Sequence, residues 1–112
     1  MPSKPKVIKN YVRSNGRSPF EDWFSRLRDS SAKARILTRI DRLRFGNFGD
    51  CKSVGGGVFE LRIHFGPGFR VYFGLVGTQI VLLLGGGDKS TQKKDIETCT
   101  NYWRDYNNGK TK

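Results

Sequence analysis

Two runs of alternating apolar and polar residues face each other across a short glycine-rich turn, and this feature limits the fold more than any other. The runs are residues 60–65, ELRIHF, and residues 69–73, FRVYF, with the sequence Gly-Pro-Gly between them. Alternation with a period of two is typical of β-strands that bury one face. Since only a loop with an odd number of residues keeps both apolar sets on one face, we predict a three-residue hairpin loop.

The polar faces of the two predicted strands bring together cations, an imidazole and a phenol. The predicted loop pairs His64 with Arg70. It also pairs Arg62 with Tyr72, so that the four side chains form one patch. The patch is either the ordinary solvated face of an antiparallel sheet or an anion site, because neighbouring arginines repel each other when no anion balances them. Glu60, on the same face, either neutralises one arginine or lies at the rim.

The rest of the chain predicts a single α+β domain over residues 1–112. The predicted elements are a strand over 7–12, helices over 18–27 and 29–46, strands over 58–65, 69–75 and 79–84, a helix over 90–106, and a frayed tail over 107–112. Ser18 starts the first helix, since it forms a Ser-x-x-Glu capping box with Glu21. We expect the helices to pack on one face of a twisted, four-stranded antiparallel sheet and to leave its other face partly open.

The predicted second helix has an apolar stripe and a basic stripe. Four apolar residues recur at helical spacing and are predicted to face the core: Ile36, Leu37, Ile40 and Leu43. Arg35, Arg39 and Arg42 lie together on the opposite side of the helix. Such a basic stripe is either an ordinary solvated helix face or a surface that binds a polyanion.

The excess of positive charge favours polyanionic partners. The chain has 21 Lys and Arg residues against 10 Asp and Glu residues, which gives a formal net charge of +11. One histidine and the widely spaced Cys51 and Cys99 predict no transition-metal site. No apolar run approaches the ~18 residues of a membrane span. The first residues lack the apolar core of a signal peptide, and so we expect a cytoplasmic protein.

The segment LLLGGGDKS, residues 82–90, is similar to a nucleotide phosphate loop but departs from it. That motif requires a glycine directly before the lysine, and here Asp88 intervenes, which argues against a nucleoside triphosphate site. Lys89 and Ser90 are predicted at the start of a helix, where free N–H groups favour an anion. The alternative is a flexible turn between a strand and a helix.

Two longer blocks resemble the RelE/ParE toxin superfamily. They are GVFELRIHFGPGFRVYFG, residues 57–74, and IVLLLGGGDKSTQKKDIETC, residues 80–99. Within the superfamily they are similar to the HigB-like group, the addiction-module killer proteins or phage-derived Gp49-like proteins. The resemblance extends from SPFEDWFSRLRD to the last predicted helix. It implies a small RelE-like α+β toxin of a type II toxin–antitoxin module. The best-known members of the superfamily cut mRNA on the ribosome without metal or small-molecule cofactor and are neutralised by a cognate antitoxin.

The resemblance also implies where the site lies. Arg62, Arg70 and Lys89 match basic positions that surround the scissile phosphate, and we predict His64 as a fourth catalytic residue, acting as a base. Five further residues are predicted to bind RNA: Tyr72, Lys52, Arg35, Arg39 and Arg42. Members also use a late tyrosine or histidine as a proton donor or for stacking. This chain has neither in that region before Tyr102, and His64 and Tyr72 are left as alternatives for the general acid, since the predicted register puts both on the same patch.

Two alternatives stand beside the ribonuclease. One is a ParE-like toxin of the same fold that inhibits DNA gyrase and has no nuclease activity. The other is a basic nucleic-acid-binding domain without toxicity. The combination of Arg62, His64, Arg70 and Lys89 favours the ribonuclease, whereas the missing late tyrosine or histidine counts against it.

Overall fold

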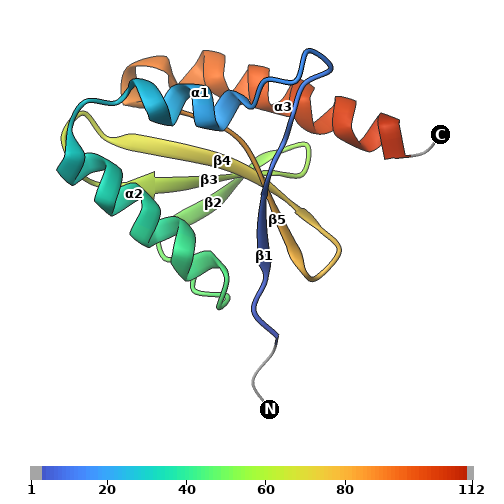
Figure 1. The fold of residues 1–112 in the computed structure, drawn as a ribbon, viewed down its shortest axis with the longest axis horizontal. Helices are drawn as coiled ribbons and strands as arrows, with labels where there is room; N and C mark the ends of the chain where they lie inside the picture. Colours follow the sequence, from blue (N-terminus) through green and yellow to red (C-terminus); the bar gives the residue numbers. More distant parts are fainter. Residues whose placement is uncertain (1–3, 111–112) are drawn as a thin grey trace.

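A five-stranded sheet with α-helices on both faces forms the part of the chain that the computed structural model describes, residues 4–110 (Figure 1). The elements follow in chain order: β1 (Val7–Asn10), α1 (Pro19–Arg26), α2 (Ser30–Leu43), β2 (Cys51–Gly55), β3 (Val58–Ile63), β4 (Phe69–Val76), β5 (Ile80–Asp88), a short 3-10 helix (Lys89–Thr91) and α3 (Gln92–Lys110). This is an α+β fold with a mostly antiparallel sheet.

The sheet differs from the predicted one in its number of strands. Its order is β1-β5-β4-β3-β2, with β1 parallel to β5 and the other pairs antiparallel. Strand β2 was not predicted, because CKSVG has no apolar periodicity. Backbone pairing with β3 defines it instead, beginning where the Arg62 N–H donates to the Asp50 carbonyl at 2.9 Å. The element order therefore differs from the predicted RelE-like order by one strand.

The hairpin between β3 and β4 is wider than predicted. Arg62 lies opposite Arg70, and Glu60 lies opposite Tyr72, so that the loop comprises residues 64–68. Gly66 and Gly68 have φ angles of 56° and 83°, in the left-handed region that glycine reaches without strain. The predicted register was thus wrong by two residues. Because the error is even, the assignment of residues to the two faces was still correct.

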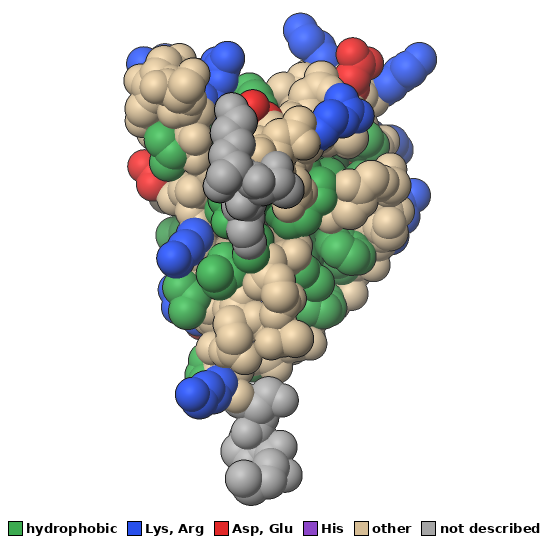
Figure 2. Space-filling model, turned by 90° about the vertical axis from the view of Figure 1, so that its right-hand side faces the viewer, with side chains coloured by type: hydrophobic (Ala, Val, Ile, Leu, Met, Phe, Trp, Pro, Cys, Tyr) green, Lys and Arg blue, Asp and Glu red, His purple; other side chains and the backbone are tan. Residues whose placement is uncertain are grey.

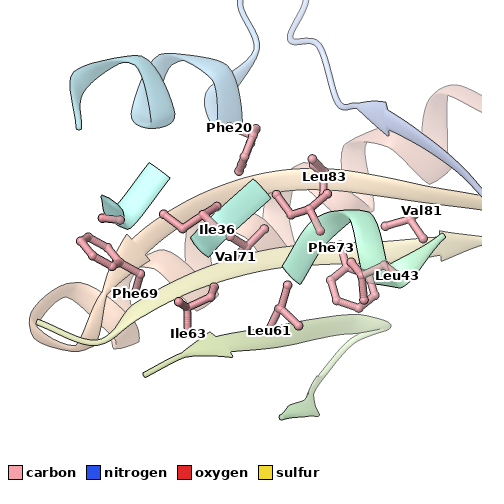
Figure 3. Close-up of a cluster of buried hydrophobic side chains, with 12 residues drawn as sticks. Phe20, Ile36, Leu43, Leu61, Ile63, Phe69, Val71, Phe73, Val81 and Leu83 are labelled. Atoms are coloured by element: carbon pink, nitrogen blue, oxygen red, sulfur yellow. The ribbon is translucent and has the colours of Figure 1, made fainter. Parts of the chain in front are cut away.

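The helices cover both faces of the sheet, contrary to the prediction of one covered face. Helices α1 and α2 cover the larger core (Figure 3). Helix α3 covers the opposite face, over a second cluster that includes Tyr72, Leu84 and Cys99. Close approach of α3 depends on glycine, since a Cβ at Gly74 would overlap the ring of Trp103. The sheet therefore has no open face under α3.

Three smaller predictions need correction. Leu37, predicted in the core, is half exposed, whereas Ile36, Ile40 and Leu43 are buried as predicted. The glycine run, considered as a flexible turn, belongs to β5, which extends to Asp88. Residues 107–110 of the predicted frayed tail continue α3, and residues 111–112 lie outside the described part of the chain. Within residues 4–110, every helix is too short or too polar to cross a bilayer.

We predict that Gly86→Ala destabilises the protein by about 1–3 kcal/mol, because the added methyl group would overlap the ring of Trp23 on α1. The matched control is Gly109→Ala in α3, where a Cβ meets no atom within 4 Å. Urea unfolding of both variants and the wild type measures the difference. Equal stability of Gly86→Ala and the wild type would contradict the close packing of α1 on β5.

Candidate functional site

Basic residues meet at one end of the sheet, next to the first turn of α3. Arg62 and Arg70 are direct cross-strand partners, and Arg70 in turn lies opposite Gly87 of β5. A Cβ at Gly68 would lie 3.0 Å from a terminal nitrogen of Arg70 and 3.7 Å from the Cβ of Lys89. The structure therefore brings together three of the four predicted catalytic residues, and we call Arg62, Arg70 and Lys89 the cationic row.

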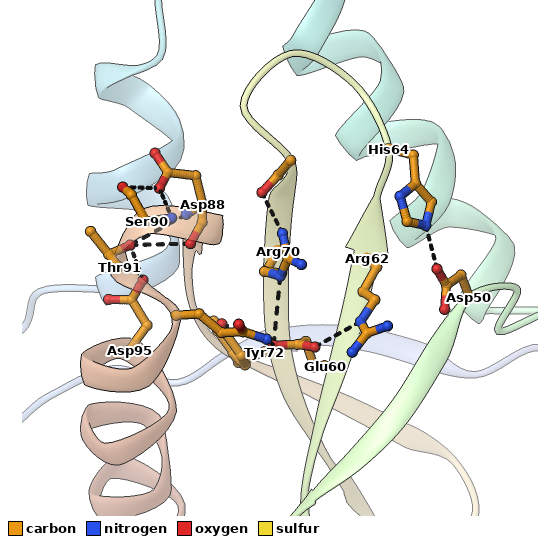
Figure 4. A network of polar contacts seen from close by, with 12 residues as sticks. Asp50, Glu60, Arg62, His64, Arg70, Tyr72, Asp88, Ser90, Thr91 and Asp95 are labelled. Carbon is orange, nitrogen blue, oxygen red and sulfur yellow. Dashed lines mark hydrogen bonds and ion pairs between the residues drawn. The ribbon is translucent and has the colours of Figure 1, made fainter.

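A buried carboxylate holds the two arginines of the cationic row (Figure 4). Glu60 is fully buried, and its Oε1 accepts a hydrogen bond from Arg62 Nε at 3.0 Å. Its Oε2 accepts from Gln92 Nε2 at 2.8 Å and from the Tyr72 hydroxyl at 3.2 Å. Arg70 Nε lies 3.8 Å from the same Oε2 and has no hydrogen-bond partner in the described residues. Glu60 thus pairs with both arginines and offsets one of their two positive charges.

The contacts of Glu60 determine its charge. Burial favours the neutral carboxyl, but the hydrogen bonds from Gln92, Arg62 and Tyr72 outweigh it and hold the pKa of Glu60 below its usual value. The hydrogen bond with Glu60 in turn raises the pKa of Arg62. The side chains of Arg62 and Arg70 are 28% and 11% exposed, so that only their ends reach solvent. Such fixed guanidinium groups suit the binding of an oxyanion.

Tyr72 does not suit the predicted role of stacking on an RNA base. It is fully buried beneath α3, and its hydroxyl donates to Glu60. Burial and the Glu60 charge raise the pKa of Tyr72 far above its usual range, so that the phenol keeps its proton. Tyr72 therefore supports Glu60 and does not form part of an accessible surface.

His64 lies in the loop after β3 and does not face Arg70, because the hairpin is wider than predicted. Its Nε2 contacts the Asp50 carboxylate at the exposed surface. That hydrogen bond lowers the pKa of Asp50. The Asp50 carbonyl accepts from the Arg62 N–H, so that the Asp50–His64 pair lies near the Arg62 backbone, whereas His64 lines the groove at α2 and not the cationic row.

The basic stripe of α2 lies on the other side of the sheet from the cationic row. Arg35, Arg39, Arg42 and His64 line a groove of about 580 Å³, together with Ser31, Ala34, Thr38 and Ile63. Arg39 is not simply solvated, because it donates to the carbonyls of Arg62 and Phe48. Arg35 lies over the Phe65 ring at 4.4 Å. The predicted RNA-binding set is thus divided between two places.

The side of the molecule that carries the end of α3 differs from this groove in the side chains it exposes. Figure 2 shows that hydrophobic side chains occupy the middle of the side that carries the end of α3, with Lys and Arg side chains at its margins. A polyanion finds fewer clustered cations there. Lys52, the last of the predicted RNA-binding residues, is exposed on β2 opposite Glu60, which places it on the cationic-row side of the sheet.

The predicted anion site at the start of the last helix is occupied by a side chain of the chain itself. The Asp88 carboxylate accepts from the N–H of Ser90 at 2.8 Å and forms a capping box with Thr91. These N–H groups are therefore not free for a phosphate. Thr91 also donates to Asp95 at 2.5 Å, and burial raises the pKa of Asp95.

Gln92 and Asp50 orient the site from α3 and from the segment before β2, but neither was predicted. No motif marks either residue. Glu60 was placed on the correct face but not recognised as the centre of the site. The sequence feature that could have identified it is its position as the one acid in the alternating run, two residues before Arg62. Within the described residues, no three His, Cys, Asp or Glu side chains gather as metal ligands.

The fold and the site define a small, basic α+β protein with a row of cations at one end of its mostly antiparallel sheet. A model of the family described as "Phage derived protein Gp49-like (DUF891)" matches residues 22–101, which include the whole cationic row and Glu60. The chain is also 58% identical over 78 residues to an "Uncharacterized protein" of Haemophilus influenzae, which covers 70% of this chain and 79% of that protein. The chain belongs to the Gp49-like family. The RelE-like and HigB-like part of the resemblance stays a prediction.

We predict that Glu60→Gln lowers the free energy of unfolding at pH 7 by about 3 kcal/mol, because it leaves two arginines without their carboxylate. The pKa of Glu60 is lowered in the folded state, so its stabilisation is present above the unfolded pKa and disappears as the pH falls. The difference between variant and wild type should therefore shrink at pH 3. Denaturant unfolding at both pH values measures it.

The control is Glu97→Gln, since Glu97 is exposed on α3. A Glu60→Gln variant as stable as the wild type at pH 7, or a difference independent of pH, would contradict the charged state of Glu60.

Proposed function

We propose that this protein is the toxin of a type II toxin–antitoxin module and that it cuts mRNA on the translating ribosome without a metal ion. The observation that carries the proposal is the cationic row, fixed by a buried carboxylate. Membership of the Gp49-like family is compatible with such a toxin. The proposal places the protein in the cytoplasm, with mRNA and the ribosome as its targets and a cognate antitoxin as its inhibitor.

The cationic row suits the charge that develops during RNA cleavage. The 2′-hydroxyl loses its proton to a base and attacks the adjacent phosphorus, the bond to the 5′-oxygen breaks, and that oxygen takes up a proton, which leaves a 2′,3′-cyclic phosphate. The pentavalent transition state of this step has more negative charge than the starting diester. Guanidinium groups stabilise it best when they need not reorganise. Glu60 holds Arg62 by a hydrogen bond, whereas Arg70 is held by its own bond to the Gly68 carbonyl and by the nearby Glu60 charge, and Lys89 adds an exposed residue beside Arg70. We assign Arg62, Arg70 and Lys89 to the phosphate.

His64 is the base in this proposal. Its Nε2 faces the Asp50 carboxylate, so that the ring presents Nδ1 as the free acceptor. Asp50 orients the imidazole, as carboxylates do in other base-catalysed sites. The pair lies at the end of the sheet where the Asp50 carbonyl accepts from the Arg62 N–H, and His64 lines the groove at α2, so the proposal requires the RNA to pass around that end from the cationic row to the imidazole. We propose that the RNA beyond the scissile bond is bound by Lys52 and by the groove that Arg35, Arg39 and Arg42 line.

A second candidate is a ParE-like toxin that inhibits DNA gyrase without nuclease activity. The burial of Tyr72 favours it, because no tyrosine is then left on the accessible part of the cationic row to act as an acid. In that case the basic surface serves binding alone. A basic domain that binds nucleic acid without toxicity is the third candidate, and it predicts no growth arrest.

We predict that induced expression of the wild type in a bacterium stops growth and creates new, in-frame mRNA 5′ ends. Lys89→Ala should reduce the yield of these ends by ~10²-fold, the usual cost of one transition-state contact. Lys89 is exposed and does not contact Glu60, so its loss should leave the fold intact. Arg70→Ala should abolish the ends, with circular dichroism to check folding.

The control is Arg44→Ala, an exposed arginine of the loop after α2 that pairs with Asp41. Growth arrest with intact mRNA and trapped gyrase complexes would establish the second candidate. Arrest and mRNA cleavage that persist in both Lys89→Ala and Arg70→Ala would place the site elsewhere.

A further inference from the structure

A second basic cluster lies away from the cationic row, where the loop before α1 meets α1 and α3. Arg13, Arg17 and Arg26 line a pocket of about 190 Å³ there, with Tyr102 on one side. The remaining lining residues are Pro19 and Asp22. The proposed function uses none of these residues.

The loop before α1 is closed on itself, which brings two of the arginines together. The Arg13 N–H donates to the Arg17 carbonyl at 2.9 Å, and the Gly16 N–H donates to the Arg13 carbonyl at 2.8 Å. The Arg17 N–H also donates to Asn15 Oδ1 at 3.0 Å. Gly16 takes a φ of 83°, which only glycine adopts without strain. The two arginines are therefore held at the ends of one tight turn.

An aromatic stack supports Arg13 from below. Its guanidinium lies 5.7 Å from the centre of the Tyr102 ring, within the range of a cation–π contact. Tyr102 in turn stacks on the buried Tyr11 at 5.2 Å. The Tyr11 hydroxyl donates to Asp105 at 2.6 Å, which fixes the stack to α3. The stacked rings thus hold the Arg13 guanidinium in position.

The charge of this pocket is not balanced by the described residues. Asp22 is its one carboxylate, and it accepts from Arg17 Nε at 2.9 Å, which leaves the terminal nitrogens of Arg17 available. No ion pair joins Arg13 or Arg26 to a carboxylate within residues 4–110. Three guanidinium groups around one pocket repel each other unless an anion lies among them. Their planar forks match the oxygens of a phosphate.

The pocket continues into a larger chamber, which has room for the uncharged part of a phosphate-bearing ligand. A cavity of about 330 Å³ shares Pro19, Arg26 and Tyr102 with it and runs between α1 and α3. The glycine run of β5 forms the floor of this chamber. The pairing of β1 with β5 ends at Leu83, so β1 does not pair with the glycine run. Asp88 and Asp95 line this chamber and disfavour a second phosphate. The ligand therefore places its phosphate in the outer pocket and an uncharged part in the inner chamber.

We propose that the cleft between α1 and α3 binds a nucleotide phosphate through Arg13, Arg17 and Arg26. The phosphate belongs either to a free mononucleotide or to the backbone of a single strand. The proposal stands on the geometry of this cleft and does not depend on nuclease activity or toxicity.

The test is a titration of the full chain with inorganic phosphate, uridine monophosphate and oligouridylate, followed by NMR through the backbone amide of Tyr102. We expect saturable binding at ~0.1 M salt, at least tenfold weaker in the double variant Arg13→Ala/Arg26→Ala. Neither side chain has a carboxylate partner in residues 4–110, so the variant should fold, and its NMR spectrum verifies this. Arg44→Ala, from the loop after α2, is the control and should bind as the wild type does.

The three probes separate the two sources of the phosphate. Equal affinity for uridine monophosphate and oligouridylate would assign the cleft to a mononucleotide. A much higher affinity for oligouridylate, with a logarithmic salt slope of about 0.7 for each phosphate bound, would assign it to a strand. Binding that is unchanged in the double variant, or no saturable binding of any probe, would overturn the proposal. Glutamate, titrated as a fourth probe, checks for a carboxylate site, and binding equal to that of phosphate would overturn the proposal too.

Discussion

The ion pairs of the Glu60 carboxylate with Arg62 and Arg70 are the interaction on which the candidate site depends. Two arginines opposite each other on neighbouring strands destabilise a sheet when nothing balances their charge. Glu60 pairs with both and offsets one of the two charges, and burial beneath α3 strengthens each contact by excluding water. Gln92 and Tyr72 complete its hydrogen bonds, so that no oxygen of the buried carboxylate lacks a donor. The contacts that stabilise the sheet at this point therefore also fix the positions of the cations.

The second covered face of the sheet makes this arrangement possible. Helix α3 supplies Gln92 and excludes water from Glu60, and it approaches the strands closely because glycines lie beneath it. On α3, the Sγ atom of Cys99 lies over Gly85, and the carboxylate of Asp95 lies over Gly87. On the other face, Gly86 leaves room for Trp23 of α1. The glycine run thus allows two helices to approach one strand, and it forms the floor of the cleft between them.

Much of the fold could be predicted because periodicity depends on local sequence alone. The alternation in β3 and β4 assigned the faces correctly even though the loop length was wrong. It could not reveal β2, which is defined by backbone pairing, nor the face on which α3 packs, since its apolar stripe is the same for either face. Gly74 and Gly85 were the available signal, as small residues where a helix approaches. The site was predicted in part: the cationic row formed, but Tyr72 is buried and His64 turns to Asp50, because burial and loop shape are tertiary properties.

The most direct test of the account is the pKa of the Glu60 carboxyl, measured by ¹³C NMR from pH 7 downwards with selective labelling of glutamate. The account predicts a value below ~4.3, the ordinary value for glutamate, because three hydrogen bonds and two guanidinium groups stabilise the charged form. A value above the ordinary one would contradict the account, because burial would then outweigh the hydrogen bonds, and a value above ~7 would leave Glu60 neutral at pH 7. The two arginines would then lack their common counter-charge, and the cationic row would not be fixed in the way described.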